Sequence, residues 1–227
     1  MNTKNLFITG GSGDIGSAII NEFKLNGYNI LAPTSNELDC SSEQSINNYF
    51  DKISLSNIHS FIHCAGWNKL ESFHDVSNEA LTKSIFINSY SFIFILKKIN
   101  GFLVDNESRL SAISSLYGTF SRKNRLAYTS SKHSLNGIIK EVAIEIGSRG
   151  ILCNTIAPGF IETKMTHLNN SLETINDFKN KIPVGRLGIP EDIAKIAFFL
   201  TSTNNSYING QNIVVDGGYS IGGFQNN

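Results

Sequence analysis

Short apolar runs and longer amphipathic segments alternate along the 227-residue chain. The apolar runs are four to seven residues long and end at small or turn-forming residues, which is typical of buried β-strands. The strands predicted in this way cover residues 6–9, 28–32, 60–65, 109–114, 151–157 and 211–215.

The segments between these runs carry apolar residues at helical spacing. In the first segment Ile15, Ala18, Ile19 and Phe23 fall on one face of a helix that Gly27 would end. Pro190, followed by two acidic residues, is a favourable helix start, because proline suits the first turn and acids suit the positive end of the helix dipole. The predicted helices cover residues 15–25, 43–53, 78–99, 127–147 and 190–201.

This alternation of strands and helices predicts an α/β fold. We expect a single doubly wound Rossmann domain over residues 1–227, with a mainly parallel sheet of six or seven strands and helices on both faces. Residues 163–183 are polar and weakly periodic, which predicts a mobile lid over a substrate site.

Charge and composition exclude several partners. The chain has 19 Lys+Arg and 19 Asp+Glu, so no net charge attracts nucleic acid or an anionic membrane. The apolar stretch at residues 6–8 is too short for a signal peptide, and the one at 92–96 cannot span a bilayer. Cys40, Cys64 and Cys153 are odd in number and lack metal-ligand spacing. They suit reduced thiols in a cytoplasmic protein, mostly in its core, and predict no metal site.

A glycine-rich turn follows the first predicted strand and reads Thr9-Gly10-Gly-Ser-Gly13-Asp-Ile-Gly16. Its glycines would let the backbone approach a pyrophosphate, whose charge the helix N-terminus would meet. The spacing differs from the usual Gly-x-Gly-x-x-Gly, and a plain strand-to-helix connection is the alternative, but the position after the first strand favours a cofactor site. The predicted contacts are Gly10, Ser12, Gly13, Asp14, Ile15 and Gly16.

The turn after the second strand, Pro33-Thr-Ser-Asn36, contains no acidic side chain. An acid there would bond the ribose 2′-hydroxyl of NAD, whereas the hydroxyls of Thr34 and Ser35 can bond a 2′-phosphate. The sequence therefore favours NADP(H) over NAD(H). Asp39 is predicted to reach the adenine edge, and the small residues that would line the ring pocket are Cys64, Ala65 and Gly66.

Tyr128 and Lys132 lie four residues apart in a predicted helix and so share one face. The ammonium should lower the pKa of the phenol from about 10 toward the range where proton transfer is efficient. Ser115 stands thirteen residues before Tyr128 at the end of a predicted strand. This set predicts proton exchange with a carbonyl or alcohol oxygen while a nicotinamide cofactor exchanges a hydride.

Further motifs follow in a characteristic order between Thr9 and Gly218: Ile113-Ser-Ser115, Tyr128-x-x-x-Lys132, Asn154, Pro158-Gly-Phe-Ile-Glu-Thr163, Gly185-Arg-Leu-Gly188, Pro190-Glu191 and Val215-Asp-Gly-Gly218. In these motifs the chain resembles the short-chain dehydrogenase/reductase family over nearly its whole length. Within that family it is most similar to bacterial 3-oxoacyl-[acyl-carrier-protein] reductases.

The resemblance implies a catalytic set of Asn88, Ser115, Tyr128 and Lys132. Ser115 would bond the substrate oxygen, Tyr128 would be the acid/base, and Lys132 would lower its pKa and bond the nicotinamide ribose. Asn88 would hold a proton-relay water. The resemblance also implies cofactor contacts from Pro158, Gly159, Ile161 and Thr163.

Two features depart from the family pattern. Asp14 stands where single-domain members usually carry a glycine, and the turn around it resembles that of the family's extended, sugar-nucleotide-modifying branch. Only six residues separate Ala32 from Asp39, so the helix after the second strand should be deleted and the third strand short or absent.

Substrate and assembly follow less directly. Arg122, Lys123 and Arg125 precede Tyr128 and would attract an anionic handle on a substrate, a solvated loop being the alternative. The resemblance implies NADPH-dependent reduction of a 3-oxoacyl thioester or similar ketone to a secondary alcohol. The alternatives are reduction of a nucleotide-linked keto-sugar for surface polysaccharide and a non-catalytic NADP-binding sensor. The helices at 78–99 and 127–147 resemble those with which the family forms tetramers, so we expect a homo-oligomer, a homotetramer or a dimer.

Overall fold

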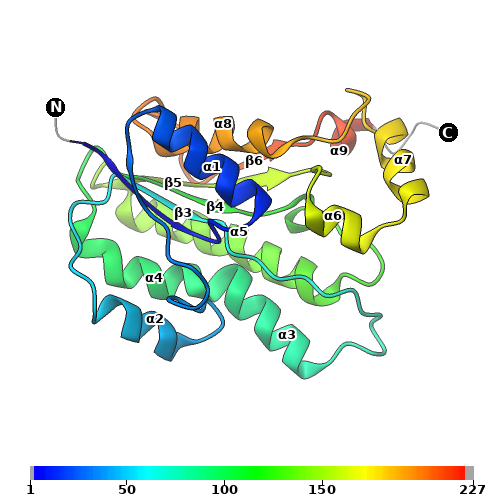
Figure 1. Ribbon diagram of the computed structural model, residues 1–227, viewed down its shortest axis with the longest axis horizontal. Helices are drawn as coiled ribbons and strands as arrows, with labels where there is room; N and C mark the ends of the chain where they lie inside the picture. Colours follow the sequence, from blue (N-terminus) through cyan, green and yellow to red (C-terminus); the bar gives the residue numbers. More distant parts are fainter. Residues whose placement is uncertain (1–2, 223–227) are drawn as a thin grey trace.

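The computed structural model describes residues 3–222, which form one α/β domain around a six-stranded parallel sheet (Figure 1). The strands lie in the order β2-β1-β3-β4-β5-β6. Their bounds are β1 (Asn5–Thr9), β2 (Asn29–Leu31), β3 (Ser60–His63), β4 (Arg109–Ile113), β5 (Leu152–Pro158) and β6 (Asn212–Val215). The predicted fold class is confirmed, and the two ends of the predicted domain, residues 1–2 and 223–227, lie outside the described residues.

Helices cover both faces of the sheet (Figure 1). One face carries α1 (Asp14–Leu25) and α8 (Pro190–Thr201), which pack against each other. The other face carries α2 (Glu43–Phe50), α4 (Ser91–Ile99) and α5 (Leu126–Gly147), with α3 (Asn78–Ile85) packed on α5. As the sequence predicted, α8 begins at Pro190.

Alternating strand residues build the two cores, because successive side chains of a strand point to opposite faces. In β1, Leu6 and Ile8 join Phe23 of α1 in one core, whereas Phe7 joins Phe61 and other residues in the second. Leu6, Phe7 and Ile8 are all fully buried. The continuous apolar character of these strands follows from burial on both sides.

The sheet ends at β2, as the shortened region of the sequence predicted. No helix or strand lies between Leu31 and Glu43 in the described chain, which passes directly from β2 to α2 and then to β3. The prediction of six or seven strands is therefore resolved in favour of six.

The predicted helix at 78–99 is continuous but changes its winding in the middle. A π-helical turn at Phe86–Tyr90 separates α3 from α4. Such turns are rare and are frequent at functional sites, and this one contains Asn88. Two short 3₁₀ turns complete this half of the fold, at Asn100–Phe102 and Leu116–Gly118.

The weakly periodic segment at residues 163–183 is helical, and its role as a lid stays a prediction. The structure has two helices there, α6 (Lys164–Asn169) and α7 (Leu172–Lys181), at the side of the domain (Figure 1). The buried residues Ile175, Phe178 and Ile182 recur at intervals of three and four and attach α7 to Phe160 and Tyr219. Tyr219 opens the last helix, α9 (Tyr219–Gly222).

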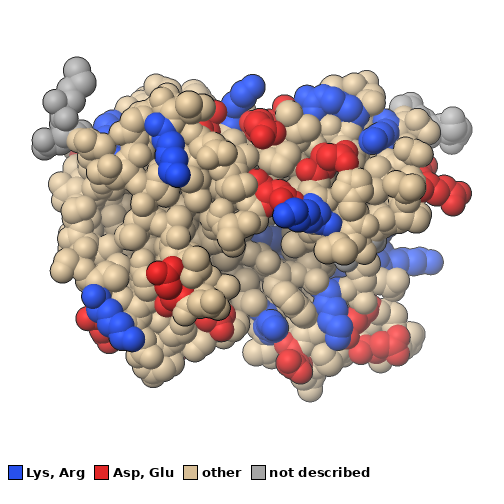
Figure 2. Space-filling model, viewed as in Figure 1, with Lys and Arg blue, Asp and Glu red and all other residues tan. Residues whose placement is uncertain are grey.

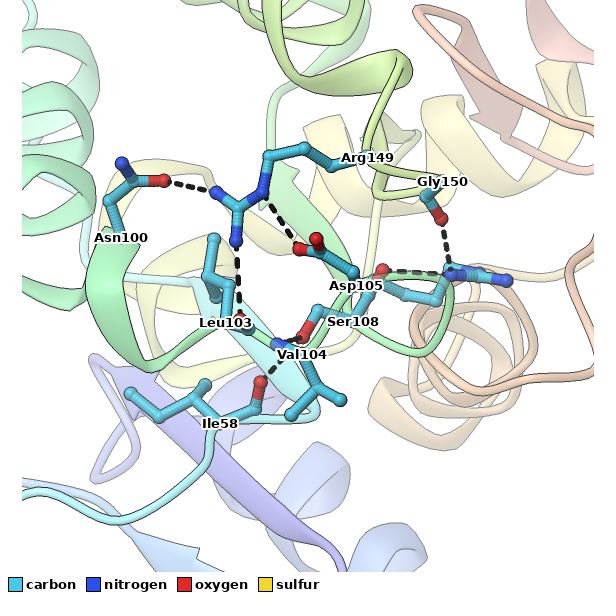
Figure 3. A network of polar contacts seen from close by, with 9 residues as sticks. Ile58, Asn100, Leu103, Val104, Asp105, Ser108, Arg149 and Gly150 are labelled. Atoms are coloured by element: carbon cyan, nitrogen blue, oxygen red, sulfur yellow. Dashed lines mark hydrogen bonds and ion pairs between the residues drawn. The ribbon is translucent and has the colours of Figure 1, made fainter.

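A polar network joins the loops at the amino-terminal ends of the strands (Figure 3). Arg149 donates to Asp105 at 2.8 Å, to Asn100 at 2.8 Å and to the Leu103 carbonyl at 3.2 Å. Ser108 donates to the Ile58 carbonyl at 2.7 Å. These contacts hold the amino-terminal ends of β3 and β4 in place. The carboxyl ends of the same strands take no part in this network.

Among the described residues, no helix combines the length and the apolar character needed to cross a membrane. Charged side chains of both signs are scattered over the face of the molecule shown in Figure 2, without a continuous patch of one sign. This agrees with the balanced charge of the sequence.

Candidate active site

The carboxyl ends of β1, β3 and β4 open into a cleft with a volume of about 530 Å³. In open parallel sheets, ligands bind at this end of the strands where the strand order reverses, and here the order reverses between β1 and β3. Most predicted cofactor residues line this cleft: Gly10, Ser12, Gly13, Asp14, Ile15, Gly16, Ser35, Asp39, Cys64, Ala65, Gly66, Tyr128, Lys132 and Thr163.

The glycine turn packs too closely for side chains. Gly10 has a φ of 69°, and a Cβ there would lie 2.5 Å from the backbone nitrogen of Ala65. A Cβ at Gly16 would collide with the carbonyl oxygen of Gly10. The helix that follows, α1, begins at Asp14, and its N-cap residue Gly13 provides no side-chain cap. Its first N–H groups therefore have no intrahelical or capping partner and suit a phosphate.

The predicted pair on α5 lies where the sequence placed it. Lys132 is buried, its Nζ donates to the carbonyl of Ile113 at 2.7 Å, and it lies 5.6 Å from the ring centroid of Tyr128. Tyr128 is half-buried and lines the cleft. Ser115, at the start of the 3₁₀ turn after β4, accepts from the Tyr117 N–H at 3.2 Å and lines the same cavity as Tyr128.

The acidity of this pair differs from the sequence prediction. Burial raises the pKa of Tyr128 above its usual value of 10.0, against the opposing effects of the Ser115 side chain and the nearby charge of Arg125. Burial also lowers the pKa of Lys132 to about 8. The expected lowering of the phenol pKa by lysine is therefore not found, because desolvation dominates for both groups.

Asn88 fastens the loop after β3 to α5. Its Oδ1 accepts from the Trp67 backbone N–H at 2.7 Å, and its Nδ2 donates to the Trp67 carbonyl at 2.9 Å and to Ser131 at 2.8 Å. The π-helical turn aims this side chain at the loop. Asn88 thus holds protein groups on both sides of its amide, and a water-holding role for it stays a prediction.

His63 supports the site from behind without lining either cavity, and the sequence analysis missed it. This fully buried side chain at the end of β3 contacts the Thr9 hydroxyl at 2.8 Å and the Ile87 carbonyl at 2.9 Å. The Thr9 oxygen in turn accepts from the Ala65 N–H at 3.3 Å. Burial lowers the pKa of His63 to about 4, so the ring is neutral at pH 7. A polar residue closing an apolar strand was the signal.

A smaller cavity of about 160 Å³ continues from the cleft past Tyr128 and Ser115. The residues that line both cavities are Ile15, Asn68, Ile113, Ser114, Tyr128, Thr163 and Met165. Of the remaining predicted contacts, Pro158, Gly159 and Ile161 line this smaller cavity, and Thr34 lines neither cavity. The first turn of α6 therefore borders both spaces, and the catalytic tyrosine predicted from the sequence lies at their junction.

The turn after β2 contains a carboxylate that the sequence analysis did not place there. Glu37 Oε2 accepts from the Thr34 N–H at 2.8 Å and from the Thr34 hydroxyl at 2.9 Å. These bonds hold the pKa of Glu37 below its usual value. Thr34 does not line the cleft, whereas Ser35 and Asp39 do. The premise that this turn lacks an acid is wrong, because Glu37 folds back over three residues.

The three basic residues before Tyr128 separate in space. Arg122 lies over the ring of Phe178 on α7, at 5.4 Å from its centroid, and Lys123 is exposed. Arg125 alone of the three lines the small cavity, where it lies over the ring of Tyr117 at 5.1 Å. They do not form one basic cluster.

The donor set fits a nicotinamide dinucleotide: an uncapped helix N-terminus behind a glycine turn, a long cleft across the sheet, and a buried lysine beside a tyrosine. Fold and site together define an NAD(P)-dependent oxidoreductase of the α/β class. Residues 23–220 match the family model described as enoyl-(acyl carrier protein) reductase. The chain belongs to the short-chain dehydrogenase/reductase family.

Curated relatives match nearly end to end. The 3-oxoacyl-[acyl-carrier-protein] reductase of Rickettsia bellii is 32% identical, over 93% of this chain and 94% of the relative. The L-rhamnose 1-dehydrogenase (NADP(+)) of Thermoplasma acidophilum is 30% identical, over 96% of each chain.

Solved structures share the fold. A short-chain dehydrogenase family protein from Francisella tularensis superposes with a TM-score of 0.87 at 23% identity, over 97% of this chain and 100% of that one. The aldohexose dehydrogenase of Thermoplasma acidophilum gives 0.89 at 23% identity, over 97% and 95%.

Proposed function

We propose that the protein reduces a ketone to a secondary alcohol with NADPH, using Tyr128 as the proton donor. The observation that carries this proposal is the position of Tyr128 at the junction of the cofactor cleft and the small cavity, beside Ser115 and above the buried Lys132. The bound nicotinamide supplies the hydride.

The chain's own residues would act as follows. Ser115 bonds the substrate oxygen and aligns it with the phenol, while Tyr128 gives its proton to that oxygen. The raised pKa of Tyr128 keeps the phenol protonated at neutral pH, which suits reduction. Lys132 donates to the nicotinamide ribose and keeps a positive charge near the developing oxyanion. Asn88 positions the loop at Trp67 that closes the cleft.

We propose a modest preference for NADP(H). Ser35 lines the cleft at the end of β2 and can donate to a 2′-phosphate. The L-rhamnose dehydrogenase relative is named for NADP(+), and a solved structure named BdcA was determined in complex with NADPH. Glu37 opposes the preference, because its carboxylate occupies the Thr34 donors.

Two substrate classes have support. A 3-oxoacyl thioester is supported by the names of most of the similar curated proteins. A sugar or keto-sugar is supported by the polar side chains of the small cavity, which include Asn68, Thr166 and Asn170, and by the two Thermoplasma proteins named for sugars.

Assembly and location are also proposals. Tyr90, the last residue of the π-helical turn, and Ile144 of α5 are 44% and 75% exposed, which supports contact with further copies in a homotetramer or dimer. The three free cysteines support a reducing, cytoplasmic setting.

The test is a panel of carbonyl substrates assayed with NADPH and with NADH. The panel contains a 3-oxoacyl thioester, a keto-sugar and a small neutral ketone. Reduction of at least one ketone, with a lower KM for NADPH than for NADH, is the expected result. Absence of nicotinamide oxidation with every carbonyl, despite measurable cofactor binding, would leave a binding protein in place of an enzyme.

A further inference from the structure

The small cavity contains a cation that the proposed hydride transfer does not require. Arg125 immediately precedes α5, and its guanidinium carbon lies 5.1 Å from the ring centroid of Tyr117. Both residues line the cavity together with Ser115 and Tyr128. The face of the Tyr117 ring holds the guanidinium in place. In the chain, Arg125 stands three residues before Tyr128.

Arg125 has no anionic partner among the described side chains. Its backbone forms an isolated parallel bridge with Glu71, whose Oε1 pairs with Lys69 at 2.7 Å and whose Oε2 is buried without a partner among the described residues. No carboxylate in residues 3–222 lies within ion-pair distance of Arg125, and its guanidinium donates no hydrogen bond there. A guanidinium presents five N–H donors in a planar fork that matches a carboxylate.

Tyr117 and Asn68 supply a second, independent observation. Tyr117 is 8% exposed, and its hydroxyl has no partner in the described part of the chain. The Oδ1 atom of Asn68, which lines the same cavity, is likewise buried without a partner. Buried polar atoms in folded proteins are nearly always hydrogen-bonded. A phenol that can donate and an amide oxygen that can accept therefore remain for a ligand.

The size of the cavity limits that ligand. A volume of about 160 Å³ corresponds to about five water molecules at roughly 30 Å³ each. This space suits a compact molecule and is small for a long acyl chain. The polar atoms also favour a ligand that carries an anion and a hydroxyl.

We propose that the substrate is a small keto acid, whose carboxylate is bound by Arg125 and the Tyr117 hydroxyl while its ketone lies against Ser115 and Tyr128. This rests on the proposed carbonyl reduction and names its substrate class. The hydride adds to the ketone carbon, the Tyr128 proton adds to the oxygen, and the carboxylate is unchanged. Asn68 accepts from a hydroxyl of the same molecule.

A different role for Arg125 predicts a different pattern of kinetics. The positive charge of Arg125 also acts to lower the pKa of Tyr128, although burial, which raises that pKa, is the larger effect. An arginine that acted only through the phenol would affect acidic and neutral ketones alike, and would change kcat and its pH profile. An arginine that binds a carboxylate changes KM for acids alone.

The experiment compares acetoacetate with acetoacetamide, which differ in the carboxylate, in the full chain with saturating NADPH. We expect Arg125→Gln to raise KM for acetoacetate at least tenfold and to change KM for the amide less than twofold. Tyr117→Phe should raise KM for acetoacetate about threefold to tenfold, since it removes one hydrogen bond. Arg122→Gln is the matched control, because Arg122 lies over Phe178 outside the cavity.

A binding measurement keeps the two proposals separate. Titration calorimetry of 3-hydroxybutanoate against the NADPH complex, a pair that cannot exchange a hydride, should give saturable binding that Arg125→Gln weakens at least tenfold. If this holds but neither ketone is reduced, the carboxylate site stands and carbonyl reduction fails. Equal effects of Arg125→Gln on acid and amide, better turnover of a 3-oxoacyl thioester than of the acid, or binding that does not depend on Arg125 would each overturn the keto-acid assignment.

Discussion

The carboxylate of Asp14 accepts a 2.7 Å hydrogen bond from the backbone N–H of Lys164, which is 150 residues further along the chain. Asp14 is the first residue of α1 and Lys164 the first of α6. The bond therefore joins the glycine turn under the predicted pyrophosphate to the segment that borders both cavities. The residue that departs from the family's usual glycine thus has a structural partner.

Replacing Asp14 should separate two effects of this carboxylate. Asp14→Ala removes the acceptor, so we expect faster proteolytic cleavage within residues 163–183 and faster cofactor release, by about fivefold for a hydrogen bond of about 1 kcal/mol. Asp14→Asn keeps an acceptor but removes a negative charge from the phosphate site. It should retain resistance to cleavage and bind the dinucleotide more tightly. Identical behaviour of the two variants would show that the hydrogen bond from Lys164 to Asp14 does not hold the segment at residues 163–183 in place.

Tyr128→Phe should lower kcat by a hundredfold or more and leave the dissociation constant of NADPH within twofold. The change deletes the proton donor and almost no volume. Stopped-flow hydride transfer and fluorescence titration of NADPH measure the two quantities. Tyr207→Phe, at a tyrosine that is 94% exposed, is the matched control. Turnover within a few-fold of wild type would remove Tyr128 from the chemistry.

The rate of reduction should fall as pH rises through about 8, because burial lowers the pKa of Lys132 to about that value. Below this pH the ammonium is present and can donate to the ribose, and above it the donor charge is lost. Lys132→Arg keeps a cation at every accessible pH, so the falling limb should move to higher pH. Lys132→Ala should weaken cofactor binding and slow turnover together. A profile that is the same for wild type and Lys132→Arg would assign the limb to another group.

Cofactor preference should depend on Glu37. Glu37→Gln weakens the acceptor on Thr34 and removes a charge, so the ratio of kcat/KM for NADPH over NADH should increase several-fold. Ser35→Asp, at the residue that lines the cleft, should shift the ratio toward NADH by repelling the 2′-phosphate. The ratio is measured with one ketone at fixed ionic strength, because phosphate contacts are screened by salt. A wild type that prefers NADH would refute the proposed NADP(H) preference.

Acid should destabilise the fold through His63. The ring has a pKa of about 4 in the folded protein and 6.5 as its reference, so the unfolded chain binds a proton that the folded one does not. Stability is therefore full above pH 6.5 and is lost as pH falls toward 4, by about 3 kcal/mol at roughly 1.4 kcal/mol per pKa unit. Urea unfolding at several pH values measures this. His63→Asn should flatten the dependence in that window.

Local patterns predicted the parts of the site that depend on neighbouring residues. Tyr128 and Lys132 share one helix turn, so their spacing fixes their relation before any tertiary contact forms. The glycine turn and the strand ends are also local, and the direction of parallel strands brings those ends to one edge of the sheet.

Contacts between segments that are far apart in the sequence could not be predicted from such local patterns. The bond from Lys164 to Asp14 depends on how α6 docks, and the helix α7 was missed because polar residues surround Ile175, Phe178 and Ile182. The predicted shift of the Tyr128 pKa was wrong in direction. Residue spacing reveals the neighbouring lysine, but it does not reveal the burial that raises this pKa. Burial is a property of the packed domain.

The outer edge of the sheet has a consequence for how copies of the chain can meet. An exposed edge strand normally offers a row of backbone groups to which another strand can add. Here β2 has only three residues, and the Pro33 that follows two positions later has no backbone N–H to donate. The β2 edge therefore offers too few backbone hydrogen-bonding groups for a strand of a neighbouring copy to pair with it and extend the sheet. At the β2 edge, association of copies is thereby directed away from continuous β-sheet.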